Sequence, residues 1–383
     1  MKIQHLKIFE SFKESYIINE NNKFRTLIPQ SVIDLATEFD KQEKQLYVVG
    51  GAVRDFLMKK KPKDFDLATN AKPEETVKIA EKLGFKTLEV GRQFGIVVVV
   101  DNNGEELEIA TFRIDKSGGR RPDAVEFTTI EGDVKRRDLT INALFYDIEK
   151  GEIVDLVGGE YDIKTGTIKT VGDPGERFDE DPLRKIRAIR FYARSGKQFD
   201  KQTEESLRAD TSLTGVSGER IYDEFNKGLH QAAKPRVFVE TLYDMGYLEY
   251  FFPNLMLYTR DFVNSKNPII HASWILQNED IRKIEKELNK AKWGKKEITY
   301  IKWLVKSKDV DFNYTYDLIR KRDQLELDFD IVKEWSILFP KQKEWINRLM
   351  TFDLNNINTE EVLSGVKPSD RTKVMIDKIR ELW

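Results

Sequence analysis

Residues 46–69 have the sequence LYVVGGAVRDFLMKKKPKDFDLAT, and this stretch decides the fold of the N-terminal part of the chain. Leu46 to Val49 is a short β-branched and aromatic run, which predicts a strand that enters a turn at Gly50-Gly51. Residues 52–58 predict a helix, and residues 64–67 predict a second strand after a basic loop. A strand, a glycine turn, a helix and a strand in this order predict an α/β head.

Asp64 and Asp66 are candidate metal ligands. One residue separates them on the predicted strand, so both carboxylates should point to one face while Phe65 points into the core. Two carboxylates on one face repel each other unless a cation lies between them, and Mg²⁺ prefers such oxygen ligands. A DxD pair alone is usually a solvated turn. Its place after a glycine turn and a helix favours a metal site.

The glycine turn upstream is suited to a triphosphate. Gly50 and Gly51 carry no side chain, so backbone N–H groups at the start of the predicted helix are open to phosphate oxygens. Arg54 lies about one helical turn further on and can reach a phosphate.

The pattern of the chain changes after about residue 173. Before it, residues 113–124 are rich in glycine and charge and predict a mobile loop. Strands are predicted at 95–101, 107–112, around 145–153 and at 167–171. From Asp181 onward nearly every segment has helical spacing. These patterns predict an α+β protein with a mixed-sheet head followed by an all-α remainder.

Composition excludes several classes of protein. The 383 residues include no cysteine and three histidines, which excludes a disulfide scaffold and thiolate chemistry and leaves little for a His-based metal site. No apolar run is long enough to span a bilayer, and the N-terminus lacks the pattern of a signal peptide. We therefore expect no membrane association and a cytoplasmic location.

A basic stretch lies between Ile281 and Val310, with ten Lys or Arg against four Asp or Glu. Trp293, Tyr300 and Trp303 are interleaved with these charges, a pattern typical of an RNA-binding surface. The alternative, which composition alone favours, is a solvated helix face whose aromatic side chains belong to the core.

Asp181, Arg184, Arg187 and Arg190 follow one another at intervals of three residues, which places them on a slowly drifting stripe of one predicted helix. Three arginines are costly in a buried face. We therefore expect either a bound polyanion or solvent exposure to account for them.

Four stretches, in order along the chain, resemble a known family. They are residues 46–69, KRRDLTINALFYD at 135–147, DEDPLRKIRAIRFYAR at 179–194 and SGERIYDEFNKGL at 217–229. Together they resemble the class II tRNA nucleotidyltransferases, or CCA-adding enzymes, and the related bacterial poly(A) polymerases.

The resemblance implies a polymerase-β-like nucleotidyltransferase head with two Mg²⁺ ions held by Asp64 and Asp66. A third carboxylate usually completes such a site, and the sequence leaves Glu108 and Asp138 as alternatives. The resemblance also implies nucleotide contacts by Gly51, Arg54, Arg137, Asp181, Arg184, Arg187 and Arg190.

Two of the residues in these motifs have a structural alternative. For Arg137 it is an ion pair with a nearby aspartate. Ser217 is expected to cap a helix of structural role.

The resemblance further implies a division into a head, a helical neck with the nucleotide-selecting motif, and a helical, RNA-binding body and tail. The expected segments are 1–28, an extension of unknown role, 29–172, 173–240 and 241–383. The expected partners are the 3′ end and acceptor arm of tRNA, CTP and ATP.

The expected activity is template-independent addition of CCA to tRNA from CTP and ATP, with release of pyrophosphate. The alternatives are a bacterial-type poly(A) polymerase and a partial CC- or A-adding enzyme. In GRQFGIVVVV (residues 91–100), Gln93 replaces a basic residue of the poly(A) polymerase pattern, which favours CCA addition. The loop that ends in RRPD (residues 120–123) is short for the family, so addition of the final A is less secure than addition of C.

Overall fold

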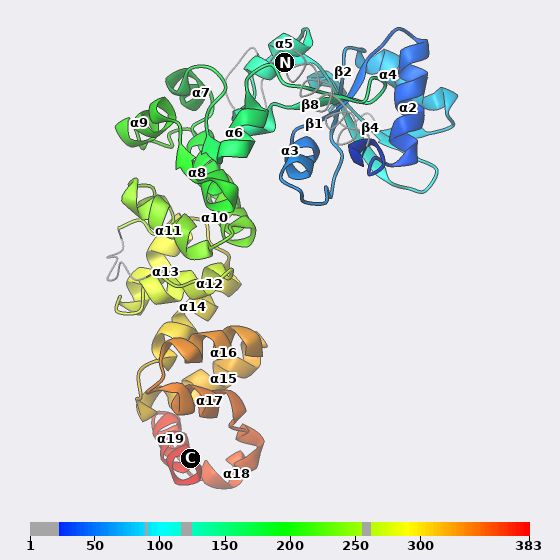
Figure 1. The fold of residues 1–383 in the computed structure, drawn as a ribbon. Coiled ribbons are helices and arrows are strands. Elements are labelled where there is room, and N and C mark those ends of the chain that lie inside the picture. The colour runs from blue at the N-terminus through cyan, green and yellow to red at the C-terminus, as the bar shows by residue number, and fades with distance from the viewer. Residues whose placement is uncertain (1–22, 89–90, 116–124, 255–261) are drawn as a thin grey trace, which may run out of the picture. The chain divides into compact units, whose positions relative to one another are not determined.

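The structure is a computed structural model that describes residues 23–88, 91–115, 125–254 and 262–383 (Figure 1). The chain forms two compact units. Unit 1 comprises residues 1–188 and 195–214, and unit 2 comprises residues 189–194 and 215–383. The RRPD motif predicted in the loop lies outside the described residues.

A seven-stranded mixed sheet forms the centre of unit 1, in the order β3-β4-β5-β2-β1-β8-β9. β2 and β5 run parallel, and every other pair of neighbours is antiparallel. Its strands are β1 (Leu46–Val49), β2 (Leu67–Thr69), β3 (Lys86–Leu88), β4 (Ile96–Val100), β5 (Glu106–Thr111), β8 (Phe145–Asp147) and β9 (Glu152–Val154). The sheet confirms the mixed-sheet head predicted from the sequence.

The two faces of this sheet have different surroundings. On one face the strands pack against α2 (Gln30–Lys41) and α4 (Pro73–Lys82), and Val48, Leu67 and Ile109 belong to that core. The opposite face has a smaller core around Tyr47 and Phe145 near β1 and β8. On β5 this second face carries the exposed Glu106 and Glu108, whereas β4 contributes the half-buried Ile96, Val98 and Val100, so the face is open along β5.

The DxD pair lies directly before β2 and not within it. The predicted strand over residues 64–67 therefore began too early. Val48 pairs with Leu67, and the N–H of Val49 donates to the carbonyl oxygen of Asp66 at 2.9 Å. β1 then ends at Gly50, which has φ +64 and turns the chain away. No β1 residue remains opposite Asp64, and the strand pairing stops there.

Two other predictions need correction. Arg113–Asp115 forms strand β6, antiparallel to β7 (Val125–Phe127), where a loop was predicted. Thr167–Ile168 forms β10, which pairs in parallel with β11 (Gln198–Phe199) and is not part of a hairpin. Each of these strands has three residues or fewer, which is too short for alternation to be recognised in the sequence. Each strand is decided by its partner strand, which the local sequence does not reveal.

Six helices complete the description of unit 1 and its boundary. They are α3 (Gly51–Leu57), α5 (Ile130–Lys135), α6 (Gly159–Thr165), α7 (Pro174–Glu180), α8 (Leu183–Ser195) and α9 (Lys201–Ala209). Residues 189–194 of α8 are counted with unit 2.

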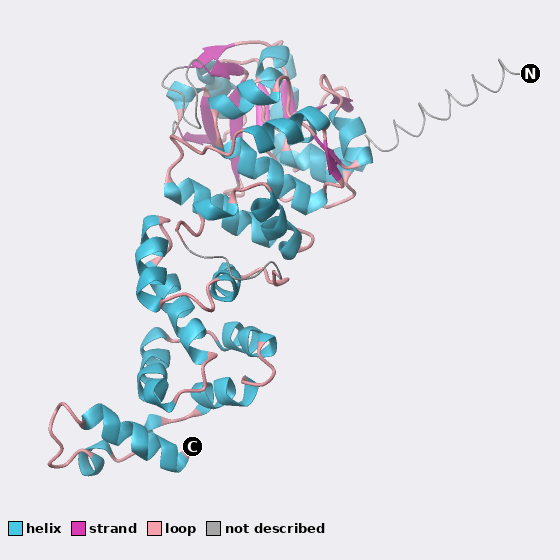
Figure 2. Ribbon diagram, turned by 90° about the vertical axis from the view of Figure 1, so that its left-hand side faces the viewer, coloured by secondary structure: helices cyan, strands magenta, loops and turns pink. Residues whose placement is uncertain are grey.

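Unit 2 is helical throughout the part that the structure describes, and Figure 2 shows strands only in unit 1. Its helices are α10 (Gly218–Gln231), α11 (Pro235–Asp244), α12 (Pro268–Ile275), α13 (Ile281–Lys290), α14 (Lys295–Ser307), α15 (Thr315–Leu325), α16 (Phe329–Leu338), α17 (Lys343–Thr351), α18 (Thr359–Val362) and α19 (Arg371–Leu382). Ser217 caps α10 as predicted, because its hydroxyl accepts from the N–H of Arg220 at 3.4 Å. No helix among the described residues is long and apolar enough to cross a membrane.

The aromatic residues of the basic stretch are core residues. Trp293, Tyr300 and Trp303 are each at most 5% exposed. The indole N–H of Trp293 donates to the carbonyl of Phe251 at 3.1 Å, and that of Trp303 to Leu318 at 2.8 Å. The alternative interpretation, in which these aromatic side chains belong to the core, is therefore correct. The three side chains offer no stacking surface for RNA bases.

His271 is fully buried in α12 of unit 2 and should make the stability of the protein depend on pH. Burial lowers the pKa of His271 to about 4, partly opposed by its contact with the carbonyl of Ser265 at 2.7 Å. The unfolded chain binds a proton below about pH 6.5 and the folded chain only near pH 4. Stability is therefore complete above pH 6.5 and falls by roughly 3 kcal/mol as the pH drops to 4.

Urea unfolding of the wild type and of His271→Gln at several pH values between 4 and 7.5 checks this prediction. The variant has no imidazole to protonate, so its stability should fall less over the same interval. Equal pH dependence of the two proteins would contradict the assignment.

Candidate active site

Three carboxylates line one cleft on the open face of the sheet in unit 1. β2 and β5 pair in parallel with Leu67 opposite Ile109, so the preceding Asp66 and Glu108 are neighbours on the same face. Asp64, two residues earlier, lines the same cleft, whose volume is about 490 Å³. We call Asp64, Asp66 and Glu108 the carboxylate site. Phe65 between the aspartates packs against the main core, as predicted.

The negative charges of this site act on one another. Burial raises the pKa of Asp66, and the charge of Asp64 raises it further, while Arg137 lowers it. Burial likewise raises the pKa of Glu108, with the charge of Asp66 as the next cause. Carboxylates whose ionisation is opposed in this way are stabilised by a cation between them.

The chemistry of the carboxylate site fits Mg²⁺, which binds carboxylate oxygens. Among the described residues, no three acidic, histidine or cysteine side chains converge closely enough to surround an ion. The fit therefore rests on the kind of donor and on the register of the two strands. The position of Glu108 beside Asp66 favours it over Asp138 as the candidate for the third carboxylate.

Asp138, the other alternative, is engaged elsewhere. Its Oδ2 accepts from Arg187 at 2.5 and 2.9 Å, and its Oδ1 accepts from the side-chain amide of Asn142 at 3.1 Å. Burial alone would raise the pKa of Asp138, but Arg187 and these hydrogen bonds outweigh it and hold the pKa well below its usual range. The ion pair leaves Asp138 with a positioning role.

The glycine turn is packed closely against neighbouring groups. A side chain at Gly50 would meet the guanidinium of Arg137 and the carbonyl of Asn142, each at 3.6 Å, and would also be strained at φ +64. Gly51 begins α3. Glycine at position 50 is thus favoured by the turn, whereas the space around it would accept a Cβ at ordinary contact distance.

Arg54 does not extend into open solvent. It is 5% exposed, pairs with Asp55 at 2.9 Å and donates to the side-chain oxygen of Asn142. Asn142 therefore links Arg54 to Asp138, and through it to Arg187 on α8. This network joins α3 to α8, and nothing in the local sequence pattern signals it.

Arg137 makes the ion pair that was its structural alternative. Its guanidinium lies 2.9 Å from Asp133, a residue that is 1% exposed, and stacks over the ring of Phe145 at 4.6 Å. The spacing of Asp133 and Arg137 at i and i+4 on a helix is a local signal that could have identified this partner.

The three arginines of the predicted stripe, all on α8, each have a carboxylate partner. Arg184 pairs with Glu180 at 2.7 Å, Arg187 with Asp138 at 2.5 Å, and Arg190 with Glu224 at 2.6 Å. The expectation that a polyanion or solvent must account for them was therefore wrong, because it overlooked partners from the protein itself. Arg190 and Glu224 are both 5% exposed at the side chain and form a buried pair in unit 2.

The first residue of this array, Asp181, is half-buried at the end of α7, where its carboxylate accepts from the N–H of Leu183 at 3.3 Å. Arg184 donates also to the carbonyl oxygens of Arg136 at 2.8 Å and Arg177 at 3.2 Å. Asp181 lies before α8, which begins at Leu183, so the prediction that it shares one helix with the three arginines was wrong. It precedes Arg184 by three residues, and both lie in unit 1.

Comparisons with known proteins identify relatives of this chain. Residues 46–169 match the poly A polymerase head domain, and residues 198–258 match the probable RNA and SrmB-binding site of polymerase A. The chain is 43% identical over 209 residues to a CCA-adding enzyme of Bacillus velezensis, which is 54% of this chain and 51% of that protein. It is 31% identical over 360 residues to a CCA-adding enzyme of a Geobacillus species, which is 92% of this chain and 82% of that protein.

Related proteins of known structure have the same fold. The crystal structure of the Bacillus stearothermophilus CCA-adding enzyme in complex with CTP matches with a TM-score of 0.66 at 25% identity, covering 91% of each chain.

Poly(A) polymerase I of Haemophilus influenzae is also similar in sequence, with 34% identity over 60% of this chain and 52% of that protein.

The sheet, the carboxylate site and the matched head domain define a nucleotidyltransferase fold. The chain belongs to the family of CCA-adding enzymes and bacterial poly(A) polymerases. It spans about half the length of the first curated relatives that it matches.

Proposed function

We propose that this protein is a template-independent nucleotidyltransferase that adds CCA to the 3′ end of tRNA from CTP and ATP and releases pyrophosphate. The observation that carries the proposal is the carboxylate site, in which Asp66, directly before β2, is a neighbour of Glu108 on the paired strand β5 beside a glycine turn. The similarity to CCA-adding enzymes at 43% and 31% identity supports the substrate.

In this proposal Asp64, Asp66 and Glu108 hold two Mg²⁺ ions. Such ions, when bound, supply activation of the primer 3′-hydroxyl and charge stabilisation of the triphosphate. The carboxylates determine where the positive charges of the ions would lie, and the open face of the sheet leaves room for the reacting groups. Nucleotidyl transfer then proceeds as an in-line displacement whose catalysis is positioning and electrostatics.

The other expected site residues take supporting roles. Gly51 offers its backbone to the triphosphate, Arg54 and Arg137 set positive charge beside the turn, and Asp181 with Arg184 reads the base. Arg187 supports the bound nucleotide while it is paired with Asp138. Arg190 is paired with Glu224 and supports α8, the helix proposed to bind the nucleotide.

The proposed partners are CTP, ATP and the 3′ end and acceptor arm of tRNA, and the proposed location is the cytoplasm. In the proposed division, residues 29–172 form the head, 173–240 the neck, and 241–383 an RNA-binding body and tail. A poly(A) polymerase is the alternative activity, which the similarity to poly(A) polymerase I keeps open.

Incubation of the protein with tRNA that lacks its 3′ CCA tests the proposal. CTP alone should give products that end in CC, and CTP with ATP should give CCA and then stop, as read by sequencing of the product ends. Long A tails with ATP alone would identify a poly(A) polymerase instead. Products that end at CC with both nucleotides would identify a partial enzyme.

Exposed lysines at the start of α14 should contribute to tRNA binding. Lys292, Lys295 and Lys296 are exposed and belong to the basic stretch. Charge reversal of all three should weaken tRNA binding by about tenfold or more and reduce its salt dependence, because phosphate contacts release counterions. Binding of CTP alone should not change, which serves as the control.

Titration of labelled tRNA at several salt concentrations measures both effects. Unaltered tRNA affinity at physiological salt would show that the three lysines are solvated surface residues that do not contact tRNA.

A further inference from the structure

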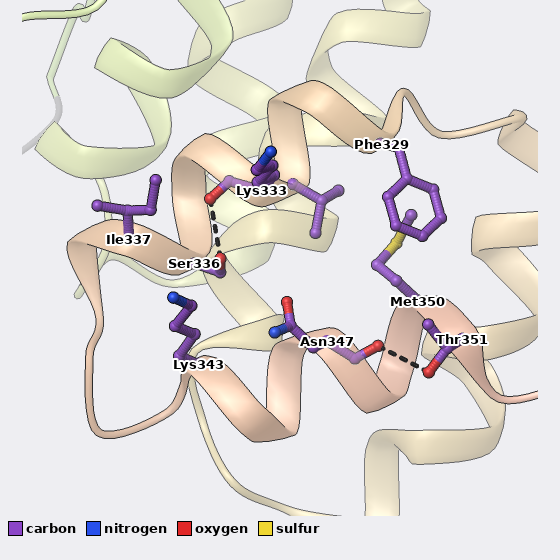
Figure 3. Close-up of a pocket in the computed structure, with 9 residues that line it drawn as sticks. Phe329, Lys333, Ser336, Ile337, Lys343, Asn347, Met350 and Thr351 are labelled. Atoms are coloured by element: carbon purple, nitrogen blue, oxygen red, sulfur yellow. Dashed lines mark hydrogen bonds between the residues drawn. The ribbon is translucent and has the colours of Figure 1, made fainter.

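A groove of about 340 Å³ runs between α16 and α17 in unit 2, well apart in sequence from the motifs of the head (Figure 3). Its walls are two stripes of side chains spaced at i, i+4 and i+8. They are Phe329, Lys333 and Ile337 on α16, and Lys343, Asn347 and Thr351 on α17. Side chains four apart on a helix lie on one face, so each helix presents one continuous stripe to the groove.

The groove exposes large apolar side chains. Phe329 and Ile337 are each 59% exposed, and Val332 and Met350 are buried and line the groove from below. The same two helices bury Trp335, Trp345 and Leu349 in the core of unit 2. The helices therefore already have a buried face, to which Val332 and Met350 also belong, and the exposed Phe329 and Ile337 lie outside that core.

The only charged side chains that line this groove are two lysines. Lys333 and Lys343 are exposed, lie on opposite helices, and make no side-chain ion pair or hydrogen bond within the described residues. The acidic Glu344 of α17 is directed to Arg348 at 3.4 Å. The groove thus combines an apolar floor with positive charge that has no acidic partner.

We infer that this groove is a docking site for an amphipathic helix of a partner protein, one with an apolar stripe flanked by acidic side chains. Each stripe covers nine residues, which is about 12 Å of helix and matches two to three turns of a third helix laid between them. Phe329 and Ile337 would contact the apolar stripe, and the lysines would face the acidic residues.

The charge pattern decides between a protein and an RNA occupant. RNA binding draws its affinity from many phosphate contacts, and two lysines around an apolar groove supply few of them. Apolar side chains with a small number of flanking charges are typical of a helix-in-groove interface. The site is separate from the proposed nucleotidyltransferase reaction.

A labelled synthetic peptide tests the inference on the full-length protein. The probe has about 16 residues with leucines at positions i, i+3, i+4 and i+7 and glutamates beside them. A second peptide carries lysine in place of every glutamate. Fluorescence anisotropy should show saturable binding of the acidic peptide at about 10 µM and at least tenfold weaker binding of the basic one.

Variants then locate the binding. Ile337→Asp should weaken the acidic peptide at least tenfold, and so should the double variant Lys333→Glu with Lys343→Glu. Their matched controls are Val310→Asp, at a side chain that is 61% exposed, and Lys367→Glu with Lys373→Glu, at exposed lysines outside the groove. The controls should bind as the wild type does. Thermal unfolding shows that each variant is folded, which the exposure of these side chains leads us to expect.

Three results would overturn the inference. One is no saturable binding of the acidic peptide up to about 1 mM. The second is tRNA affinity that falls in the groove variants and not in their controls, which would assign the groove to RNA. The third is a dimer in sedimentation that the groove variants dissociate, which would assign it to a second copy of the chain.

Discussion

Replacement of Asp64 or Asp66 by asparagine should abolish nucleotide incorporation while the protein stays folded. Both side chains line the cleft of the carboxylate site, and neither belongs to a hydrophobic core. Loss of one carboxylate removes charge stabilisation from the transition state, and such losses commonly exceed a thousandfold. The expected residual rate is therefore below about a thousandth of wild type.

Stability should be unchanged or slightly higher in the Asp66 variant. Burial and the charge of Asp64 both raise the pKa of Asp66, which means that the folded state opposes its ionisation. A neutral asparagine removes that cost. Thermal unfolding in the absence of metal measures this effect and separates a catalytic loss from misfolding.

Glu106→Gln is the matched control for this experiment, because Glu106 lines the same cleft two residues from Glu108. It removes one negative charge without touching the carboxylate site, and we expect activity within a few fold of wild type. Glu108→Gln should instead lose activity by at least about tenfold. Retention of more than about a tenth of the wild-type rate by Asp64→Asn or Asp66→Asn would refute the two-metal assignment.

Replacement of Arg184 by alanine should lower the use of CTP and ATP and erode discrimination against UTP. Cytosine and adenine each present an exocyclic amine beside an unprotonated ring nitrogen. An aspartate can accept from the amine while an arginine donates to the ring nitrogen. Uracil and guanine reverse this edge, which creates two buried mispairings of a few kcal/mol in total.

The arrangement of Arg184 suits this role. Glu180 at 2.7 Å and the carbonyl of Arg136 at 2.8 Å hold its guanidinium in place, and Asp181 lies one turn before it. A donor that is already oriented loses less entropy when the base binds. We expect Arg184→Ala to reduce the preference for C over U by about a hundredfold.

Arg187→Ala is the comparison, since Arg187 pairs with Asp138 and is linked through Asn142 to Arg54. Its loss should slow all four nucleotides to a similar extent. The measurement is kcat/KM for each nucleotide on a tRNA that ends at the discriminator base. Full retention of the preference for C over U in Arg184→Ala would move base reading to another residue.

Several features of this protein could be predicted from the sequence alone because their signals are local. A run of β-branched residues that ends at Gly50-Gly51 specifies a strand and a turn, and the alternation of Asp64, Phe65 and Asp66 separates a polar from an apolar face. The cap at Ser217 and the helical character after Asp181 follow from short-range spacing as well. Ordered motifs of this kind were sufficient to indicate the family.

The tertiary structure decided what depends on partners remote in the chain. The register of β2 and β5 sets Glu108 beside Asp66, and strand register depends on packing across the whole sheet. The pairs Arg187–Asp138 and Arg190–Glu224 join residues 49 and 34 positions apart, beyond any helical period. Periodicity shows which face a residue occupies, and only folding brings two remote faces together.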